Sequence, residues 1–222
     1  MWRRRTAAIV RRMIKDSWNE EAGLFCVLHN EQPIPVVTPF NLFPLWTGQL
    51  PDHMRERLIA HLTNPDEVWR EHIIPTVAHN GPHFKPETMW RGPAWVNINC
   101  CFIEALRQIG EHGLAHTLLT KTLDLVMSQP SIYEYHNPET GEPPATAVDA
   151  FGWTAAFFID LAIQASREEG GTPRSWASGS SKTGLGLSYA IYLTRSFLGS
   201  LPKELFEPAY LDCVLLTKEV RR

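Results

Sequence analysis

The chain has 222 residues, of which 44% are hydrophobic and 20% charged, and its 21 basic and 24 acidic residues give a net charge of −3. This length and apolar content suffice for one globular domain that needs neither a disulfide framework nor a structural metal. The balanced charge argues against nucleic-acid binding, because no basic stripe with interleaved aromatic residues occurs.

The chain begins with a predicted amphipathic helix over residues 6–18. Its inward stripe comprises Ile9, Val10, Met13 and Ile14. Residues 1–15 are rich in arginine and lack acidic residues, which is also typical of a mitochondrial presequence. We favour the core-facing helix, and with it a cytoplasmic protein.

An extended insertion should follow this helix. Residues 23–37 alternate apolar residues with Pro33 and Pro35, which predicts a short hairpin rather than a central strand. Residues 40–46 form a short apolar segment. The next predicted helix spans residues 51–62, with Pro51 at its start, and Asn64 should cap a further short helix.

Helices and long loops alternate in the rest of the apolar sequence. Residues 74–93 read as a long loop, and helices are predicted over residues 95–110, 112–127 and 151–166. The last helix is apolar nearly all round, which predicts burial on most sides. Together these elements predict an all-α fold built from α/α hairpins, with about six core helices. A closed (α/α)₆ toroid needs twelve, so we expect roughly half of a ring.

Composition changes after residue 169. Residues 170–186 are dominated by Gly, Ser and Thr, and residues 187–222 are only weakly amphipathic. We therefore predict a partial catalytic domain over residues 1–169, followed by a linker and weakly ordered tail over residues 170–222.

The four cysteines and the hydropathy restrict the compartment. The cysteines show no C-x-x-C spacing, which favours a reducing environment. No run reaches the ~18 apolar residues of a membrane span, so we expect no membrane association.

Two motifs carry the candidate chemistry. The first runs from Met89 to Asn99 and contains Trp90, Arg91, Gly92, Trp95 and Asn97. Exposed indoles can hold sugars against their faces, and guanidinium and carboxamide groups can bind hydroxyls. Core filling is the alternative for the tryptophans, a loop clamp for Arg91, and a backbone partner for Asn97 and Asn99.

The second motif places Glu134 between Tyr133 and Tyr135, in a loop between two helices. Partial burial and phenol hydrogen bonds would suit a general base, whereas a solvated loop glutamate is the alternative. Glu139 and Glu142 sit beside turn residues, so solvation is expected for both. His72, His79 and His83 lack ligand spacing, and we predict no metal and no cofactor.

These motifs resemble glycoside hydrolase family 63, especially mannosylglycerate and glucosylglycerate hydrolases. Similar tracts in that family are Trp-Arg-Gly-Pro-x-Trp, a Glu in a loop that ends Asn/Asp-Pro-x-Thr-Gly, and a helix that starts Phe-x-Trp-Thr-Ala. The last begins here at Phe151 and includes Trp153. The resemblance covers residues 9–166.

The resemblance implies an (α/α)₆ barrel that hydrolyses α-glycosides with inversion. Glu134 would be the general base, and Trp90, Arg91, Gly92, Trp95, Asn97, Tyr135 and Trp153 would line or support the sugar subsite. The family's general acid is an Asp in a motif that residues 1–89 lack. We therefore expect the C-terminal part of a glycosidase that acts on an oligosaccharide or small glycoside but lacks the acid.

Two other functions remain open at this point. One is a noncatalytic carbohydrate-binding or regulatory remnant. The other is a helical scaffold in which a homodimer, rather than a missing N-terminal half, covers the exposed helix faces.

Overall fold

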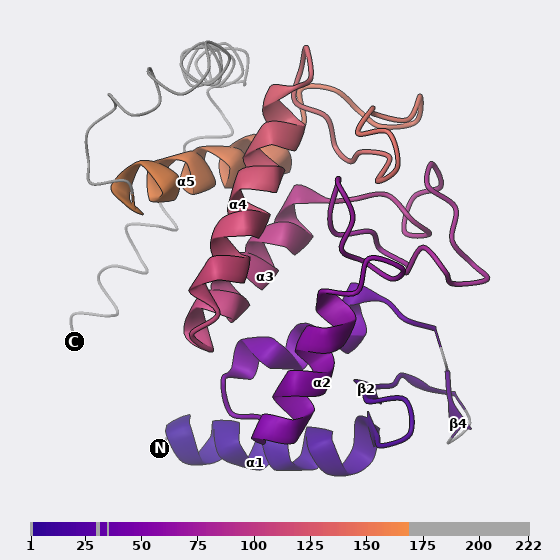
Figure 1. Ribbon diagram of the computed structural model, residues 1–222, viewed down its shortest axis with the longest axis vertical. Helices are drawn as coiled ribbons and strands as arrows, with labels where there is room; N and C mark the ends of the chain where they lie inside the picture. Colours follow the sequence, from indigo (N-terminus) through magenta and orange to yellow (C-terminus); the bar gives the residue numbers. More distant parts are fainter. Residues whose placement is uncertain (1, 30–31, 35, 169–222) are drawn as a thin grey trace, which may run out of the picture. The chain divides into compact units, whose positions relative to one another are not determined.

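The structure is a computed structural model that describes residues 2–29, 32–34 and 36–168, and within them it is built from helices and long loops (Figure 1). The predicted all-α class is thereby confirmed. The α-helices are α1 (Trp2–Ser17), α2 (Asp52–Leu62), α3 (Val96–Gln108), α4 (His112–Met127) and α5 (Gly152–Glu168). Two 3₁₀ helices, η1 (Pro39–Asn41) and η2 (Phe43–Thr47), precede α2.

The predicted insertion is a pair of two-residue hairpins. Strand β1 (Trp18–Asn19) pairs antiparallel with β2 (Leu24–Phe25), and β3 (Leu28–His29) pairs with β4 (Gln32–Pro33). The Asn19 side chain closes the first turn by accepting a hydrogen bond of 2.8 Å from the Ala22 backbone. The ring of Trp18 meets that of Phe25 edge to face, at 5.1 Å between centroids.

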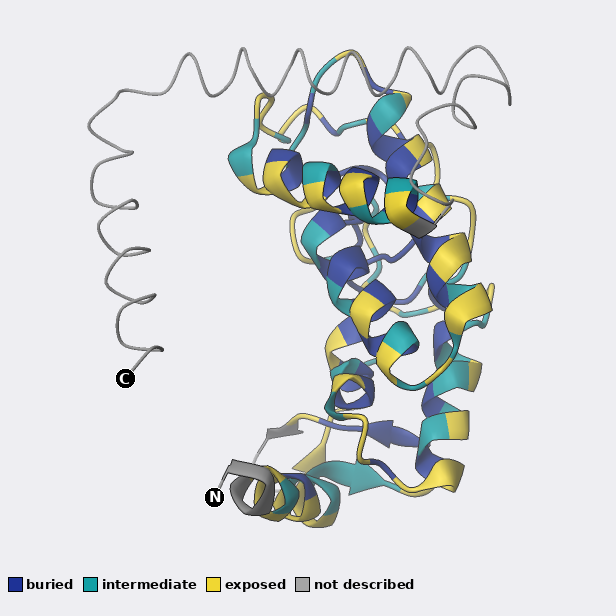
Figure 2. Cartoon of the chain, turned by 90° about the vertical axis from the view of Figure 1, so that its left-hand side faces the viewer, coloured by how far each residue is buried: buried dark blue, intermediate teal, exposed yellow. Residues whose placement is uncertain are grey.

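The core lies between α3, α4 and α5, with η2 packed on α3. Ile98, Phe102, Ile103 and Leu106 lie on one stripe of α3 and are buried, as their helical spacing requires. The ring centroids of Phe43 in η2 and Phe102 lie 5.3 Å apart. Figure 2 shows the buried residues of these helices on their facing sides.

Glycine and proline set several helix ends. Pro51 caps α2, and Gly110, in the left-handed region at φ 87°, lets the chain reverse between α3 and α4. The prediction of a short helix after Asn64 is wrong. There the Asn64 carbonyl accepts hydrogen bonds from the amides of Glu67, Val68 and Trp69, and the chain forms turns instead.

Other sequence expectations also need correction. The described residues contain five α-helices rather than six. Ile9 of α1 is exposed, whereas Val10 is buried. Helix α5 packs by one side only and exposes Trp153, Phe157 and Ile163 on the other. None of the described helices combines the length and the apolar character needed to cross a bilayer. The predicted linker and tail, residues 170–222, lie outside the described residues.

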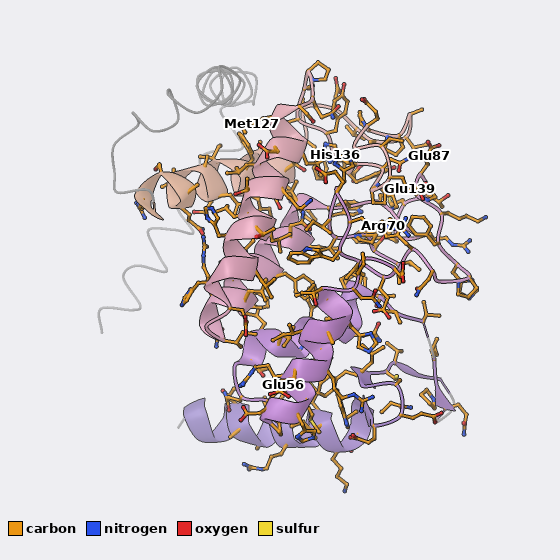
Figure 3. All side chains as sticks on the ribbon, in the orientation of Figure 1. Glu56, Arg70, Glu87, Met127, His136 and Glu139 are labelled. Carbon is orange, nitrogen blue, oxygen red and sulfur yellow. The ribbon has the colours of Figure 1, made fainter. Side chains whose placement is uncertain are left out.

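The loops that join α2 to α3 and α4 to α5 gather on the same side of the helices (Figure 1). An isolated β-bridge between Ala94 and His136 joins the two loops, and a second, between Pro75 and Ala94, closes the α2–α3 loop on itself. Figure 3 shows His136, Glu87, Glu139 and Arg70 among the side chains on this side. The fold thus brings both candidate motifs together.

Candidate active site

A column of three aromatic rings forms the centre of the site. Trp90 stacks on Trp95 with 4.3 Å between ring centroids and 9° between planes, and Trp95 lies 5.1 Å from Tyr135. Trp90 is 47% exposed, Trp95 3% and Tyr135 0%. The column therefore runs from solvent into the core, and only its outermost ring offers a face to a ligand.

The backbone of Trp90 adopts a conformation that non-glycine residues seldom take. Its φ is 62°, in the left-handed region. The flanking turn holds it there, because the Arg91 amide donates to the Thr88 carbonyl at 2.9 Å and the Lys85 amide donates to the Arg91 carbonyl at 2.7 Å. Holding a residue in this backbone conformation costs ~1–3 kcal/mol of stability, and residues of this kind are concentrated at functional sites.

Gly92 follows directly and lies against the Lys85 backbone. A Cβ built on Gly92 would stand 2.4 Å from the Lys85 carbonyl oxygen and 3.0 Å from the Pro86 Cα. Because these are backbone atoms, no side chain fits without moving the loop. Gly92 thus allows close packing of the loop that carries Trp90, and its place in the site stays a prediction.

Glu134 lies one residue from the base of the column. Since Ala94 and His136 exchange backbone hydrogen bonds of 2.8 and 3.0 Å, Trp95 meets Tyr135. Glu134 directly precedes Tyr135 in the chain, so its Cα lies ~3.8 Å from that of the innermost residue of the column.

The peptide groups of Glu134 are held on both sides. Its amide donates to the Val148 carbonyl at 2.9 Å, and its carbonyl accepts a bond of 3.4 Å from the hydroxyl of buried Thr154. The side chain is half-buried, and its carboxylate forms no hydrogen bond or ion pair with the described residues. The backbone of Glu134 is thus fixed, and its carboxylate is open to a ligand.

Tyr135 and the turn after it support this loop. The Tyr135 hydroxyl donates to the Thr146 hydroxyl at 2.9 Å. In the turn, the Asn137 side chain accepts from the Glu139 amide at 2.9 Å, and Gly141 takes φ 78°. The Asn-Pro-x-Thr-Gly motif therefore has a structural basis, and Glu139 is exposed, as is Glu142.

The remaining predicted residues have different surroundings. Arg91 and Asn97 are half-buried, and their side chains have no polar partner among the described residues. The clamp alternative for Arg91 is therefore not observed. Trp153 is exposed at the start of α5, next to the Thr154 that bonds Glu134. Asn99, in contrast, is fully buried and bonds backbone groups.

Three buried side chains lack the partners that burial normally requires. Among the residues that the structure describes, neither ring nitrogen of His79 or His136 has a hydrogen-bond partner, nor does the Trp95 indole nitrogen. Burial, with a smaller contribution from His72, lowers the pKa of His136 to about 4, and burial lowers that of His79 to about 4. Both imidazoles are therefore neutral near pH 7.

The histidines do not assemble a metal centre. No cluster of three or more His, Cys, Asp or Glu side chains suited to a metal occurs among the described residues. His72 lies against Gly141, and His79 packs on Phe84 at 4.7 Å between centroids.

Sequence reasoning missed three supporting residues: Thr76, His136 and Thr154. The Thr76 hydroxyl accepts a hydrogen bond of 2.9 Å from the Gly92 amide, across 16 positions of sequence. Thr154 bonds Glu134 across 20 positions. Such pairings leave no local pattern. His136 lies two residues after Glu134, and Thr154 is part of the Phe-x-Trp-Thr-Ala tract, so these positions could have drawn attention to both.

Comparisons with known proteins identify the family to which this sequence is similar. Residues 1–154 match the model of the mannosylglycerate hydrolase MGH1-like glycoside hydrolase domain. A mannosylglycerate hydrolase of Thermus thermophilus is 34% identical over 147 residues, which are 64% of this chain and 34% of that protein. A probable mannosyl-oligosaccharide glucosidase of Schizosaccharomyces pombe is 29% identical over 170 residues, 67% of this chain and 21% of that protein.

A solved structure shows the same fold. A glycoside hydrolase family 63 mannosylglycerate hydrolase, also from Thermus thermophilus and in complex with glucose, matches with a TM-score of 0.59 and 26% identity. The match covers 68% of this chain and 35% of that one. The chain thus spans about a third of the length of the mannosylglycerate hydrolases it matches.

Proposed function

The chain belongs to the family of mannosylglycerate hydrolase MGH1-like glycoside hydrolase domains, and on this premise we propose that it carries the base and the sugar-binding wall of an inverting α-glycosidase. One observation supports this most: the half-buried carboxylate of Glu134, which has no partner among the described residues, lies one residue from a column whose outer ring is exposed. The proposed substrate is a glucosyl or mannosyl glycoside.

In this mechanism, the pyranose lies on the outer face of Trp90, where its C–H surface meets the indole. Glu134 takes a proton from a water molecule as that water attacks the anomeric carbon on the face opposite the leaving group. Arg91 and Asn97 bind hydroxyl or carboxylate groups of the substrate, since neither has another partner among the described residues. An acid ~6.5–9.5 Å from Glu134 must protonate the leaving oxygen in an inverting enzyme.

We assign that acid to a part of the family domain other than the described residues. This assignment is supported by coverage, because the chain matches only 34% of the length of the mannosylglycerate hydrolase of Thermus thermophilus. The same reasoning makes α1 to α5 one part of an (α/α)₆ toroid, and the exposed side of α5 is where further helices would pack. A second copy of the chain is the alternative, and a dimer mass by light scattering would favour it.

We further propose that the protein acts in the cytoplasm. The free thiols of Cys26, Cys100 and Cys101 support a reducing compartment.

A substrate that needs no acid tests the base directly. An α-mannosyl or α-glucosyl fluoride loses fluoride without protonation, so Glu134 alone should accelerate its hydrolysis. Glu134→Gln should reduce fluoride release by ~10²- to 10⁴-fold, whereas Glu139→Gln, an exposed glutamate of the same loop, should leave it unchanged. Proton NMR should show the β-anomer as the first product.

The two outcomes separate the proposal from its alternative. Equal fluoride release by the wild type and Glu134→Gln would remove Glu134 from the mechanism. Binding of mannosylglycerate by calorimetry without any fluoride release would favour the noncatalytic carbohydrate-binding protein.

A further inference from the structure

Asn99 is a carboxamide with no exposed surface, followed in α3 by the largely apolar stretch from Cys100 to Ile103. Its Oδ1 accepts a hydrogen bond of 2.8 Å from the Ile74 amide, and its Nδ2 donates to the Ile73 carbonyl. Nδ2 also donates to the Thr122 hydroxyl on α4 at 3.1 Å. Both N–H donors of the carboxamide are therefore used, and no other side chain of this size offers the same set.

The segment that Asn99 holds is the one that supports the aromatic column. Two residues after Ile74, the Thr76 hydroxyl accepts a hydrogen bond of 2.9 Å from the Gly92 amide. The Thr76 amide donates to the Gly92 and Pro93 carbonyls at 3.3 and 3.2 Å. A line of hydrogen bonds thus leads from the first turn of α3, through Ile74 and Thr76, to the loop that carries Trp90.

Burial makes each link of this line strong. Ile73, Ile74 and Thr76 are each at most 1% exposed, so water cannot replace a lost partner. If Asn99 only joined α3 to α4, its bond to Thr122 would suffice. The two further bonds to the backbone at Ile73 and Ile74 serve the loop, because they fix its distance from the helix.

We propose that Asn99 is a positioning residue that sets where Trp90 and Trp95 stand relative to Glu134. The proposal rests on the proposed function and deepens it, since it names the residue that positions the Trp90 ring on which the sugar lies. A displacement of ~1 Å in such a site can cost about 10²-fold in rate. Asn99 itself, being fully buried, touches no ligand.

The test uses the full chain labelled with 5-fluorotryptophan, with the Trp90 and Trp95 ¹⁹F resonances assigned from Trp90→Phe and Trp95→Phe. Asn99→Leu keeps the side-chain volume but removes all three hydrogen bonds. It should shift both resonances and weaken mannosylglycerate binding by about tenfold or more. Thr122→Val, which leaves the bonds to Ile73 and Ile74 in place, should shift neither.

A second variant cuts the same line at its other end. Thr76→Val removes the hydroxyl that holds Gly92 and should shift the same two resonances as Asn99→Leu, so it decides the matter if Asn99→Leu does not fold. Because the two residues act in series, the double variant should bind no more weakly than the weaker single one.

The proposal is overturned if both resonances keep their positions in Thr76→Val, or if Thr122→Val shifts them as much as Asn99→Leu does. The ¹⁹F resonances of Trp90 and Trp95 test the positioning role of Asn99 in the absence of any sugar. A wild type that binds no mannosylglycerate would therefore count against a mannosyl substrate and leave the Asn99 result to stand by itself.

Discussion

Replacing Gly92 by alanine tests the close approach on which the whole site depends. The added methyl carbon would meet the Lys85 carbonyl oxygen at 2.4 Å, the Lys85 carbonyl carbon at 2.7 Å and the Pro86 Cα at 3.0 Å. Real Cβ atoms do not approach backbone atoms so closely, so one of the two loop segments must move. Overpacking of this kind costs ~1–3 kcal/mol, and we expect the upper end because the obstacle is backbone.

The matched control is Gly113→Ala in the first turn of α4. Nothing lies within 4 Å of the Cβ position there, and alanine is ~0.5–1 kcal/mol better than glycine inside a helix. Gly92→Ala should lower Tm by roughly 6–12 °C, at ~2–4 °C per kcal/mol for a domain of this size, while Gly113→Ala should raise it slightly. Differential scanning calorimetry measures both.

The site should respond as well as the stability. Because Gly92 lies between Trp90 and Trp95, Gly92→Ala should also weaken mannosylglycerate binding, even well below its Tm. An unchanged Tm together with unchanged ligand affinity would show that the loops do not approach as described.

Three smaller predictions concern Tyr135, His136 and Arg91, which belong to the aromatic column or directly adjoin one of its residues in the chain. Tyr135→Phe removes the hydrogen bond to Thr146 and should cost ~0.5–1.5 kcal/mol in urea unfolding, without loss of the Trp95 contact; a larger cost would mean that the hydroxyl has other partners. The pKa of His136, near 4 in the folded chain, lies below its ordinary 6.5, so the unfolded chain binds the proton first and stability falls as pH drops from 6.5 towards 4. Between pH 7.5 and pH 5 the loss should be about 2 kcal/mol, and His136→Leu should reduce the slope of unfolding free energy against pH; an equal slope in both proteins would contradict this. Arg91→Gln should weaken mannosylglycerate binding while leaving Tm unchanged, because the guanidinium has no partner among the described residues, and a lower Tm would reveal a structural contact.

Local signals were sufficient for the helices with clear periodicity and defined ends. Met54, Leu58 and Leu62 follow one stripe of α2 and are buried. Gly110 lies between α3 and α4 and allows the chain to reverse there, as the conformational freedom of glycine suggests. Asn64 misled the prediction, because a good capping residue also closes an isolated turn.

Other features depend on partners distant in sequence. The apolar surface of α5 predicted burial on most sides, yet Trp153, Phe157 and Ile163 are exposed. Periodicity reports that a surface is apolar, not whether this chain supplies its cover. The column is likewise invisible locally, because Trp95 meets Tyr135 only through the pairing of Ala94 with His136. Sequence motifs could single out Trp90 and Glu134 as candidates, but could not bring their two loops together.

Ala94 pairs on one side with Pro75 and on the other with His136. Ala94 is thus the middle member of two single-residue bridges, and these bridges fix the register between the α2–α3 loop and the α4–α5 loop. Adding or deleting one residue beside Ala94 would turn Trp95 to the opposite face and bring a different side chain over Tyr135. Change in this region should therefore proceed by substitution, with the length from Gly92 to Trp95 kept constant.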